Sequence, residues 1–273
     1  MPARIRVDHR YADIDAGGGV RTWIRSLMGD PDAPFDQTLN QPWDRQPADR
    51  DHRVVHLHDH RRTAWLDEYR QARNRGAGIV TTIHNHAPYC PSQSKFFQRM
   101  GRPCSIAMSP GGCMASRFLM RCGRRNPVAA VGEFRRASAV LEVLRGGRVQ
   151  TLVYTEFVRR QLLDQGVPDP VIGLAPIPMT SADWPAPAPP PEAPPRLLFT
   201  GRLSPDKGLS WLIDALAAAD GEVVLDVAGS GDDEHHARRR VEELGLAARV
   251  TFHGWVDAPR VRELLARCWV AVV

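Results

Sequence analysis

Two hydrophobic periods alternate along this chain. Short apolar runs typical of buried strands are followed by segments in which apolar residues recur every three or four positions, as on one face of a helix. Before residue 184 the pattern predicts strands at residues 5–7, 53–57, 78–83 and 150–154, and helices at 20–28, 64–73, 128–144 and 156–165. Residues 30–52 are rich in proline and aspartate and are expected to form a loop.

The same alternation continues to the end of the sequence. It predicts strands at residues 196–200, 223–229, 249–254 and 269–273, and helices at 209–219, 235–245 and 259–268. The last strand is expected to be buried. Strands that alternate with helices form right-handed crossovers and a parallel sheet, so both parts are predicted to be α/β. Ligands of such sheets bind beyond the carboxyl ends of the strands.

A proline run divides the chain. Seven of the eleven residues in 185–195 are proline, which predicts an extended spacer because proline donates no backbone hydrogen bond to a helix or sheet. We therefore expect an N-terminal domain over residues 1–184, a linker over 185–195, and a partial second domain over 196–273.

Composition narrows the class of protein. Hydrophobic residues make up 43% and charged residues 25% of the 273 residues, which excludes a disordered chain. The sequence contains no apolar run long enough to span a membrane, and its start does not resemble a secretory signal. We expect a cytoplasmic protein whose five cysteines are reduced or bound to metal.

The net charge of +5 is due mostly to arginine and suits an anionic partner. One arginine cluster could be a solvated face or a basic surface for peripheral contact with the inner membrane face. Nucleic-acid binding is not expected, because no aromatic residues are interleaved to stack on bases. The cluster consists of Arg117, Arg121, Arg124, Arg125, Arg135 and Arg136.

The most informative motif is GRLSPDKG at residues 201–208. Gly201 follows a predicted strand, Arg202 supplies a planar fork of donors, and Lys207 precedes the next predicted helix. Two cations beside a positive helix terminus suit a diphosphate, although a solvated turn with two surface cations would have the same spacing.

The order and spacing of several motifs resemble retaining glycosyltransferases of family four. The motifs are GRLSPDKG, VAGSGDDE and RVTFHGWV, preceded by GGGVRTWIRSL and TTIHNH upstream. The resemblance implies a GT-B architecture, in which two Rossmann-like domains face a cleft. It also implies transfer of a sugar from a nucleotide-sugar donor to an acceptor with retention. The acceptor could be a saccharide, a lipid-linked molecule or a small molecule.

The resemblance also implies roles for individual residues. Arg202 and Lys207 would stabilise the leaving diphosphate, so that no cofactor is required for transfer. His84 would contact the donor sugar or the reacting groups, although Asn85 stands where the family usually has an acidic residue and His86 could be the relevant ring. Four further glycines would let backbone lie close to the phosphate, the nucleotide or the acceptor: Gly18, Gly19, Gly229 and Gly231.

Family members continue with two glutamates separated by seven residues, and this sequence stops at Val273 before such a motif. On the resemblance, we expect a truncated chain that is inactive as a transferase. A non-catalytic nucleotide-sugar-binding remnant is the first alternative.

A zinc-dependent hydrolase is the second alternative. In an extended strand, alternation would place the rings of His56, His58 and His60 on one face. The segment is similar to the H-x-H-x-D-H motif of metallo-β-lactamase-like hydrolases, but one residue is missing between His58 and Asp59. A strand end that lines the interdomain cleft explains the same residues.

Cysteines form a separate cluster in the irregular stretch near residues 85–126. Cys90, Cys104, Cys113 and Cys122 lie within 33 residues. Four thiols can hold a tetrahedral zinc ion that orders a long loop. The spacing has no C-x-x-C pair, so buried thiols without a ligand are the alternative.

Overall fold

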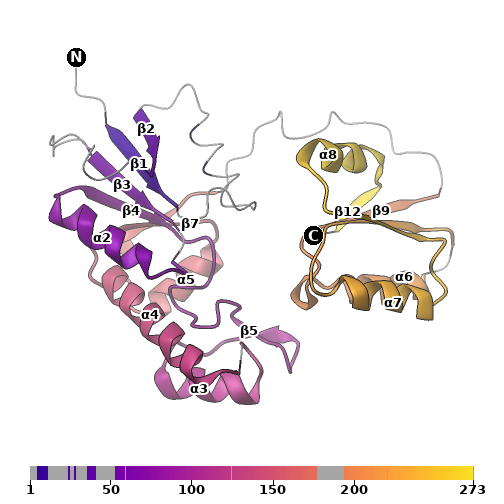
Figure 1. The fold of residues 1–273 in the computed structure, drawn as a ribbon, viewed down its shortest axis with the longest axis horizontal. Coiled ribbons are helices and arrows are strands. Elements are labelled where there is room, and N and C mark those ends of the chain that lie inside the picture. The colour runs from indigo at the N-terminus through magenta and orange to yellow at the C-terminus, as the bar shows by residue number, and fades with distance from the viewer. Residues whose placement is uncertain are drawn as a thin grey trace. The chain divides into compact units, whose positions relative to one another are not determined.

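The computed structural model describes residues 5–11, 24, 28, 36–40, 53–58, 60–123, 125–176, 194–219 and 221–272. The chain divides into two compact units, Met1–Pro178 and Met179–Val273 (Figure 1). The division falls just before the proline run, most of which lies outside the described residues.

The first unit contains a six-stranded sheet in which every neighbouring pair is parallel. The order is β2-β1-β3-β4-β7-β8, and the strands are Arg6–Arg10 (β1), Asp36–Leu39 (β2), Arg53–Leu57 (β3), Gly78–Thr82 (β4), Gln150–Val153 (β7) and Ile172–Leu174 (β8). The direction of winding reverses between β1 and β3. In a doubly wound sheet, the carboxyl ends of the strands at this point form the usual binding crevice.

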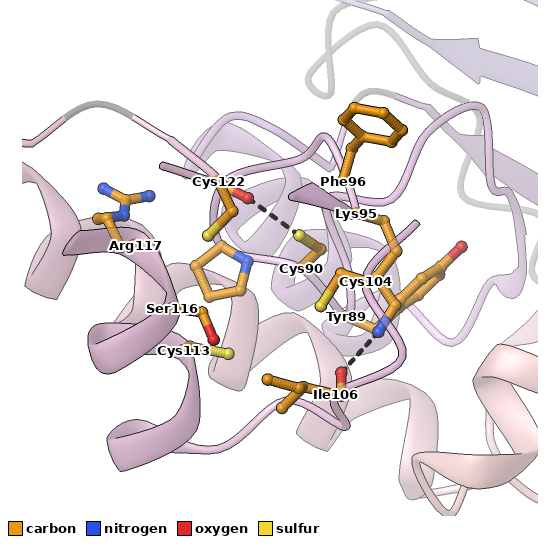
Figure 2. Close-up of a pocket in the computed structure, with 12 residues that line it drawn as sticks. Tyr89, Cys90, Lys95, Phe96, Cys104, Ile106, Cys113, Ser116, Arg117 and Cys122 are labelled. Atoms are coloured by element: carbon orange, nitrogen blue, oxygen red, sulfur yellow. Dashed lines mark hydrogen bonds between the residues drawn. The ribbon is translucent and has the colours of Figure 1, made fainter. Parts of the chain in front are cut away.

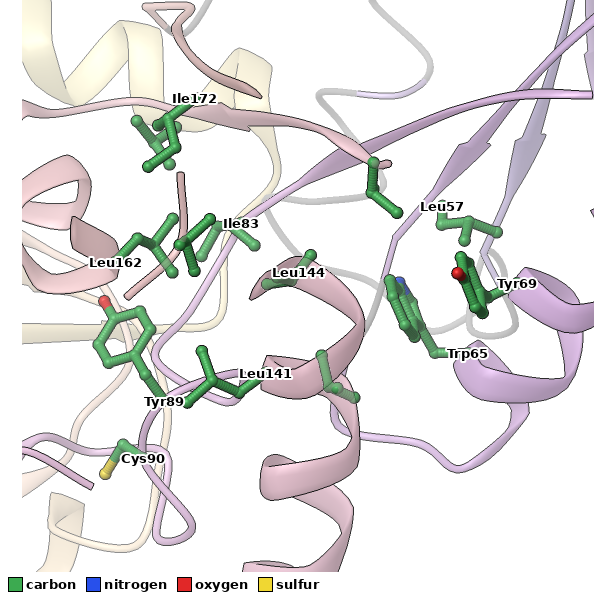
Figure 3. Close-up of a cluster of buried hydrophobic side chains, with 14 of the residues drawn as sticks. Leu57, Trp65, Tyr69, Ile83, Tyr89, Cys90, Leu141, Leu144, Leu162 and Ile172 are labelled. Carbon is green, nitrogen blue, oxygen red and sulfur yellow. The ribbon is translucent and has the colours of Figure 1, made fainter. Parts of the chain in front are cut away.

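Four helices of this unit are α2 (Ala64–Asn74), α3 (Pro110–Leu119), α4 (Pro127–Arg145) and α5 (Glu156–Asp164). The longest, α4, begins at Asn126, whose side chain accepts a hydrogen bond of 3.1 Å from the backbone N–H of Ala129. Its apolar face buries Leu141 and Leu144 completely against Leu57 of β3 and Leu162 of α5 (Figure 3). This shared core packs the helices against the sheet, whose carboxyl edge carries the loops described below.

The structure differs from the predictions in two segments. Residues 30–52 were expected to be a loop, but they include β2, which pairs with β1 at the sheet edge. The stretch near 85–126 was expected to be irregular, but it contains α3 and a short antiparallel hairpin, Phe96–Phe97 (β5) with Arg102–Pro103 (β6). Strand β2 has the sequence DQTL, so it lacks the apolar run by which a strand is recognised.

The second unit contains a parallel sheet of four strands in the order β11-β10-β9-β12. Numbered along the chain this is 3-2-1-4, the order of a Rossmann fold, and the winding reverses between β9 and β12. The strands are Arg196–Thr200 (β9), Val224–Ala228 (β10), Val250–Gly254 (β11) and Val270–Val272 (β12), and the helices are Leu209–Ala218 (α6), Glu234–Glu243 (α7) and Ala258–Arg267 (α8).

Helices cover both faces of this second sheet. Figure 1 shows α6 and α7 on one face and α8 on the other. Ile213 of α6 and Ala237 of α7 pack with Val227 of β10, and Leu264 of α8 packs with Leu198 of β9. The predicted parallel strand near the end of the chain is confirmed as β12, but the expectation that it is buried is wrong. In the described part of the chain it pairs with β9 at the sheet edge, and Val270 is 52% exposed.

Candidate functional site

Histidines gather at the carboxyl edge of the first sheet, where its winding reverses. His9 lies in β1, His56 and His58 lie at the end of β3, and His84 follows β4. The first three are 2%, 6% and 3% exposed, and His84 is partly buried. Parallel pairing of β1, β3 and β4 therefore brings together rings that are far apart in the sequence.

Three of these rings, those of His9, His58 and His84, form a continuous chain of hydrogen bonds, and His56 Nε2 instead lies 2.8 Å from Thr82 Oγ1. His9 Nε2 is 3.0 Å from Gln37 Oε1, and His9 Nδ1 is 3.3 Å from His58 Nε2. His58 Nδ1 is 3.0 Å from His84 Nε2, and His84 Nδ1 is 2.7 Å from the Tyr154 hydroxyl. With Gln37 Oε1 as an acceptor, each histidine in turn must donate through Nε2 and accept through Nδ1, so the Tyr154 hydroxyl donates to His84.

The two hydrogen bonds to His58 and Tyr154 occupy both ring nitrogens of His84. Contact between His84 and a substrate would therefore require the ring to give up a bond to Tyr154 or to His58. His86, the alternative ring, lies elsewhere and has its Nδ1 2.6 Å from the Tyr89 hydroxyl. Burial lowers the pKa of His86, and the nearby Lys95 lowers it further.

Burial keeps the cluster neutral. It lowers the pKa of His9, and it lowers the pKa values of His56 and His58 further, with repulsion from neighbouring histidines acting in the same direction. Neutral rings can each donate and accept one hydrogen bond, which the chain of bonds requires.

The three histidines of the predicted hydrolase motif do not act as one group. His60 turns away and places its Nε2 2.8 Å from Thr81 Oγ1, and its ring packs against Trp65. Among the described residues, the group whose possible ligand atoms all lie within 4.8 Å of one another is His9, His56 and His58. His9 was missed because the sequence around it, RVDHR, shows only an end of a short strand.

In the second unit, the loops after β9 and β10 pack directly on each other. The backbone N–H of Gly201 donates to Ala228 O over 3.0 Å, and that of Leu203 donates to Ser230 O over 3.0 Å. A Cβ on Gly229 would lie 1.8 Å from Gly201 O, and one on Gly231 would lie 2.2 Å from Leu203 O. The fold therefore requires glycine at both positions, because the backbone of the loop after β9 fills the space that a side chain would need.

The same packing presents Arg202 and Lys207 to solvent. The Arg202 side chain is 71% exposed, with Nε 3.3 Å from Ser204 Oγ and a terminal nitrogen 3.9 Å from Asp206. Lys207 is exposed and ends a short 3₁₀ turn, Pro205–Lys207. Gly208, with a φ of 75°, is the N-cap residue immediately before α6. Both cations thus follow β9, the strand at which the winding of this sheet reverses.

Two members of the predicted arginine cluster do not belong to a surface. Arg117 is buried and pairs with Glu133, and Arg136 is buried and donates to His60 O. Arg121, Arg125 and Arg135 are exposed. The basic surface is therefore smaller than the sequence predicts.

Within the described residues, no helix has the length and apolarity to cross a membrane.

The four clustered cysteines line one small cavity in the first unit. Burial raises the pKa values of the Cys113 and Cys122 thiols. Gly18, Gly19 and Arg124 lie outside the described residues.

Sequence comparisons match part of the chain. Over 110 residues the chain is 29% identical to lipopolysaccharide 1,6-galactosyltransferase of Salmonella typhimurium, a match that covers 40% of this chain and 31% of that protein. Over 91 residues it is 31% identical to the GtfA subunit of a UDP-N-acetylglucosamine–peptide N-acetylglucosaminyltransferase of Streptococcus gordonii, a match that covers 32% of this chain and 18% of that protein. The matches thus span about a third or less of each relative.

Solved structures show the fold of the chain as a whole. HepE of Anabaena in complex with UDP and glucose superposes with a TM-score of 0.62 at 13% identity, over 98% of this chain and 73% of that one. Sucrose-phosphate synthase of Thermosynechococcus elongatus gives a TM-score of 0.61 at 15% identity, over 98% and 75%. The family described as Glycosyl transferases group 1 matches residues 181–273. The family match therefore lies within the second unit, and the solved structures show that the chain has the GT-B fold with its Rossmann-like domains.

Proposed function

We propose that this protein acts in sugar transfer and binds a nucleoside-diphosphate sugar through the loop after β9. Arg202 and Lys207 bind the diphosphate, and the sugar passes to an acceptor hydroxyl with retention of configuration. The observation that carries the proposal is the exposure of both cations beside the start of α6, at the strand where the second sheet reverses its winding.

The chemistry of this loop suits a leaving diphosphate. When the bond between the sugar carbon and the phosphate oxygen breaks, its electron pair stays on the diphosphate, which gains negative charge. The acceptor oxygen bonds to the sugar carbon, and the proton of its hydroxyl passes to the leaving diphosphate. A guanidinium fork and an ammonium group held in place stabilise that charge, and the first N–H groups of α6 add a positive dipole end. Gly208 precedes α6 and supplies no side-chain cap to compete with an anion.

Asp206 is the nearest competitor for Arg202. Their separation of 3.9 Å, with both side chains more than half exposed, makes this a weak surface pair. A diphosphate offers two phosphates within reach of both cations, so it can displace Asp206 at little cost. Transfer then needs no resident metal, since this chain supplies the positive charge.

For His84 we propose contact with the donor sugar or the reacting groups. In the structure the ring donates to His58 and accepts from Tyr154. Of these two, the bond to Tyr154 is the one that a substrate hydroxyl can replace without breaking the chain that leads to His9.

A metal-dependent hydrolase remains a second candidate, favoured by the proximity of His9, His56 and His58. These rings are buried and His9 and His58 already bond to each other, so a metal there would have to break that bond and would have little room for a substrate.

Replacement of Arg202 or Lys207 by alanine tests the donor site. We expect each change to weaken UDP binding by about 1.5 kcal/mol or more, which is roughly tenfold in Kd, because each removes a charged hydrogen bond to phosphate. Isothermal titration calorimetry of the full chain with UDP measures this.

Arg239→Ala is the matched control, since Arg239 is an exposed arginine on α7 of the same unit. It should leave the affinity unchanged. Equal affinities of the wild type, Arg202→Ala and Lys207→Ala would refute the donor-site assignment. UDP binding without sugar transfer from any UDP-sugar would leave the alternative of a non-catalytic binding protein.

A further inference from the structure

Four cysteines from four separate points of the chain surround one cavity (Figure 2). Cys90 follows β4 in a turn, Cys104 comes directly after β6, Cys113 lies in α3, and Cys122 follows α3. The cavity has a volume of about 30 Å³, which is room for one or two water-sized bodies. None of the four cysteines is in a disulfide.

We propose that Cys90, Cys104, Cys113 and Cys122 bind a single structural zinc ion that holds the segment 85–126 together. Four cysteine sulfurs are the ligand set of a closed structural zinc site, and the cavity has room for one ion. This inference is independent of the donor site, which lies in the second unit.

The charges around the cavity fit such a centre. Four thiolates on one Zn²⁺ carry a net charge of −2, which is costly to bury without nearby cations. Lys95 lines the cavity, is only 5% exposed, and donates from Nζ to Ile106 O over 2.6 Å. Arg117 also lines it and is buried but is paired with Glu133, so Lys95 is the compensating cation, and no aspartate or glutamate is among the described residues that line the cavity.

The local backbone needs an additional source of stability. The hairpin β5–β6 has two residues in each strand, so it cannot be stable by itself. Gln93, Lys95 and Arg121 have φ values of 65°, 49° and 54°, in the left-handed region that non-glycine residues seldom adopt. Such strained residues persist only when their surroundings fix them, and metal binding energy is folding energy.

Zinc would draw the four segments closer together. Among the described residues, the group whose possible ligand atoms lie within 4.8 Å of one another is His9, His56 and His58. The sulfurs of the four clustered cysteines are therefore more widely spaced than this. Tetrahedral zinc–sulfur bonds of about 2.3 Å place sulfurs about 3.8 Å apart. One side-chain hydrogen bond already ties the two ends of the segment, since Ser94 Oγ donates to Cys122 O over 3.0 Å. At the first end, Ser92 Oγ lies 3.2 Å from Cys90 Sγ.

Metal analysis of the full chain, expressed with zinc in the medium and purified without chelators, tests the proposal. We expect close to one zinc per chain, and Cys104→Ser and Cys113→Ser should each lower this content at least severalfold. Cys268→Ser is the matched control, because Cys268 lies in the second unit and its thiol contacts Leu265 O. It should retain the full content, as should His9→Gln.

Two further measurements keep the test decisive if the serine variants fail to fold. Cobalt added to the apo wild type should give the intense absorption of thiolate-to-cobalt charge transfer, and chelation should speed proteolysis within residues 85–126 while leaving UDP affinity unchanged. Zinc-free protein with no cobalt–thiolate absorption overturns the proposal. So does iron with sulfide in place of zinc, or zinc that is lost in His9→Gln but retained in Cys104→Ser.

Discussion

Gly229→Ala is expected to lower the free energy of unfolding of the second unit by more than about 4 kcal/mol, the range of the most severe single substitutions. The added Cβ would lie 1.8 Å from Gly201 O and 2.9 Å from its carbonyl carbon. Neither backbone can move away easily, because Gly201 N–H donates to Ala228 O and Gly229 N–H donates to Gly254 O. Urea denaturation of the full chain, followed by far-ultraviolet circular dichroism, measures the loss.

Gly221→Ala separates this overlap from the cost of the backbone angle. Gly221 has a φ of 97°, and a Cβ there would meet no atom within 4 Å. That variant should lose only about 1–2 kcal/mol, the cost of an unfavourable backbone conformation alone. If both variants are destabilised equally, the two loops do not pack as closely as described.

The first unit is expected to lose stability steeply as the pH falls below about 6.5. Burial lowers the pKa values of His9, His56 and His58, and lowers that of His60 to about 3. Below pH 6.5 the unfolded chain therefore binds protons that the native state does not, and stability falls with pH. Each histidine with a strongly lowered pKa contributes up to about 1.4 kcal/mol per pH unit, so His56, His58 and His60 together contribute up to about 4 kcal/mol per pH unit.

Urea denaturation at pH 7.5, 6.5 and 5.5 measures this dependence. His60→Gln should flatten the curve, because the amide can still bond to Thr81 Oγ1 but does not titrate. His235→Gln is the control, since His235 is exposed on α7. A free energy of unfolding for the first unit that stays constant between pH 7.5 and 5.5 would contradict the buried, neutral cluster.

The fold could be predicted largely from local pattern. The strands predicted at residues 53–57 and 196–200 are β3 and β9 of the structure. Apolar runs that alternate with helices can bury both of their faces in a parallel sheet that helices cover, so their pattern predicts this arrangement. Strand β2 could not be predicted, since the sequence DQTL has a single apolar residue, Leu39, and the strand forms by pairing with β1 at the sheet edge.

The sequence predicts the positions of side chains in the candidate sites only where neighbouring residues determine them. The position of Arg202 and Lys207 after β9 could be predicted, because a motif of neighbouring residues follows one apolar strand. The histidine chain could not, since it depends on the register between β1, β3 and β4, which places His9 beside His56. Spacing within HLHDH suggested a partner in His60, which instead bonds to Thr81.

Hydrogen exchange of the full chain, measured by mass spectrometry with and without saturating UDP, tests the central claim most directly. Ligand contact slows the exchange of backbone amides that it orders or covers. The account predicts slower exchange in residues 201–208 and at the start of α6, with no change around His9, His56 and His58. Protection confined to the first unit, or none in residues 201–208 at saturating UDP, would contradict it.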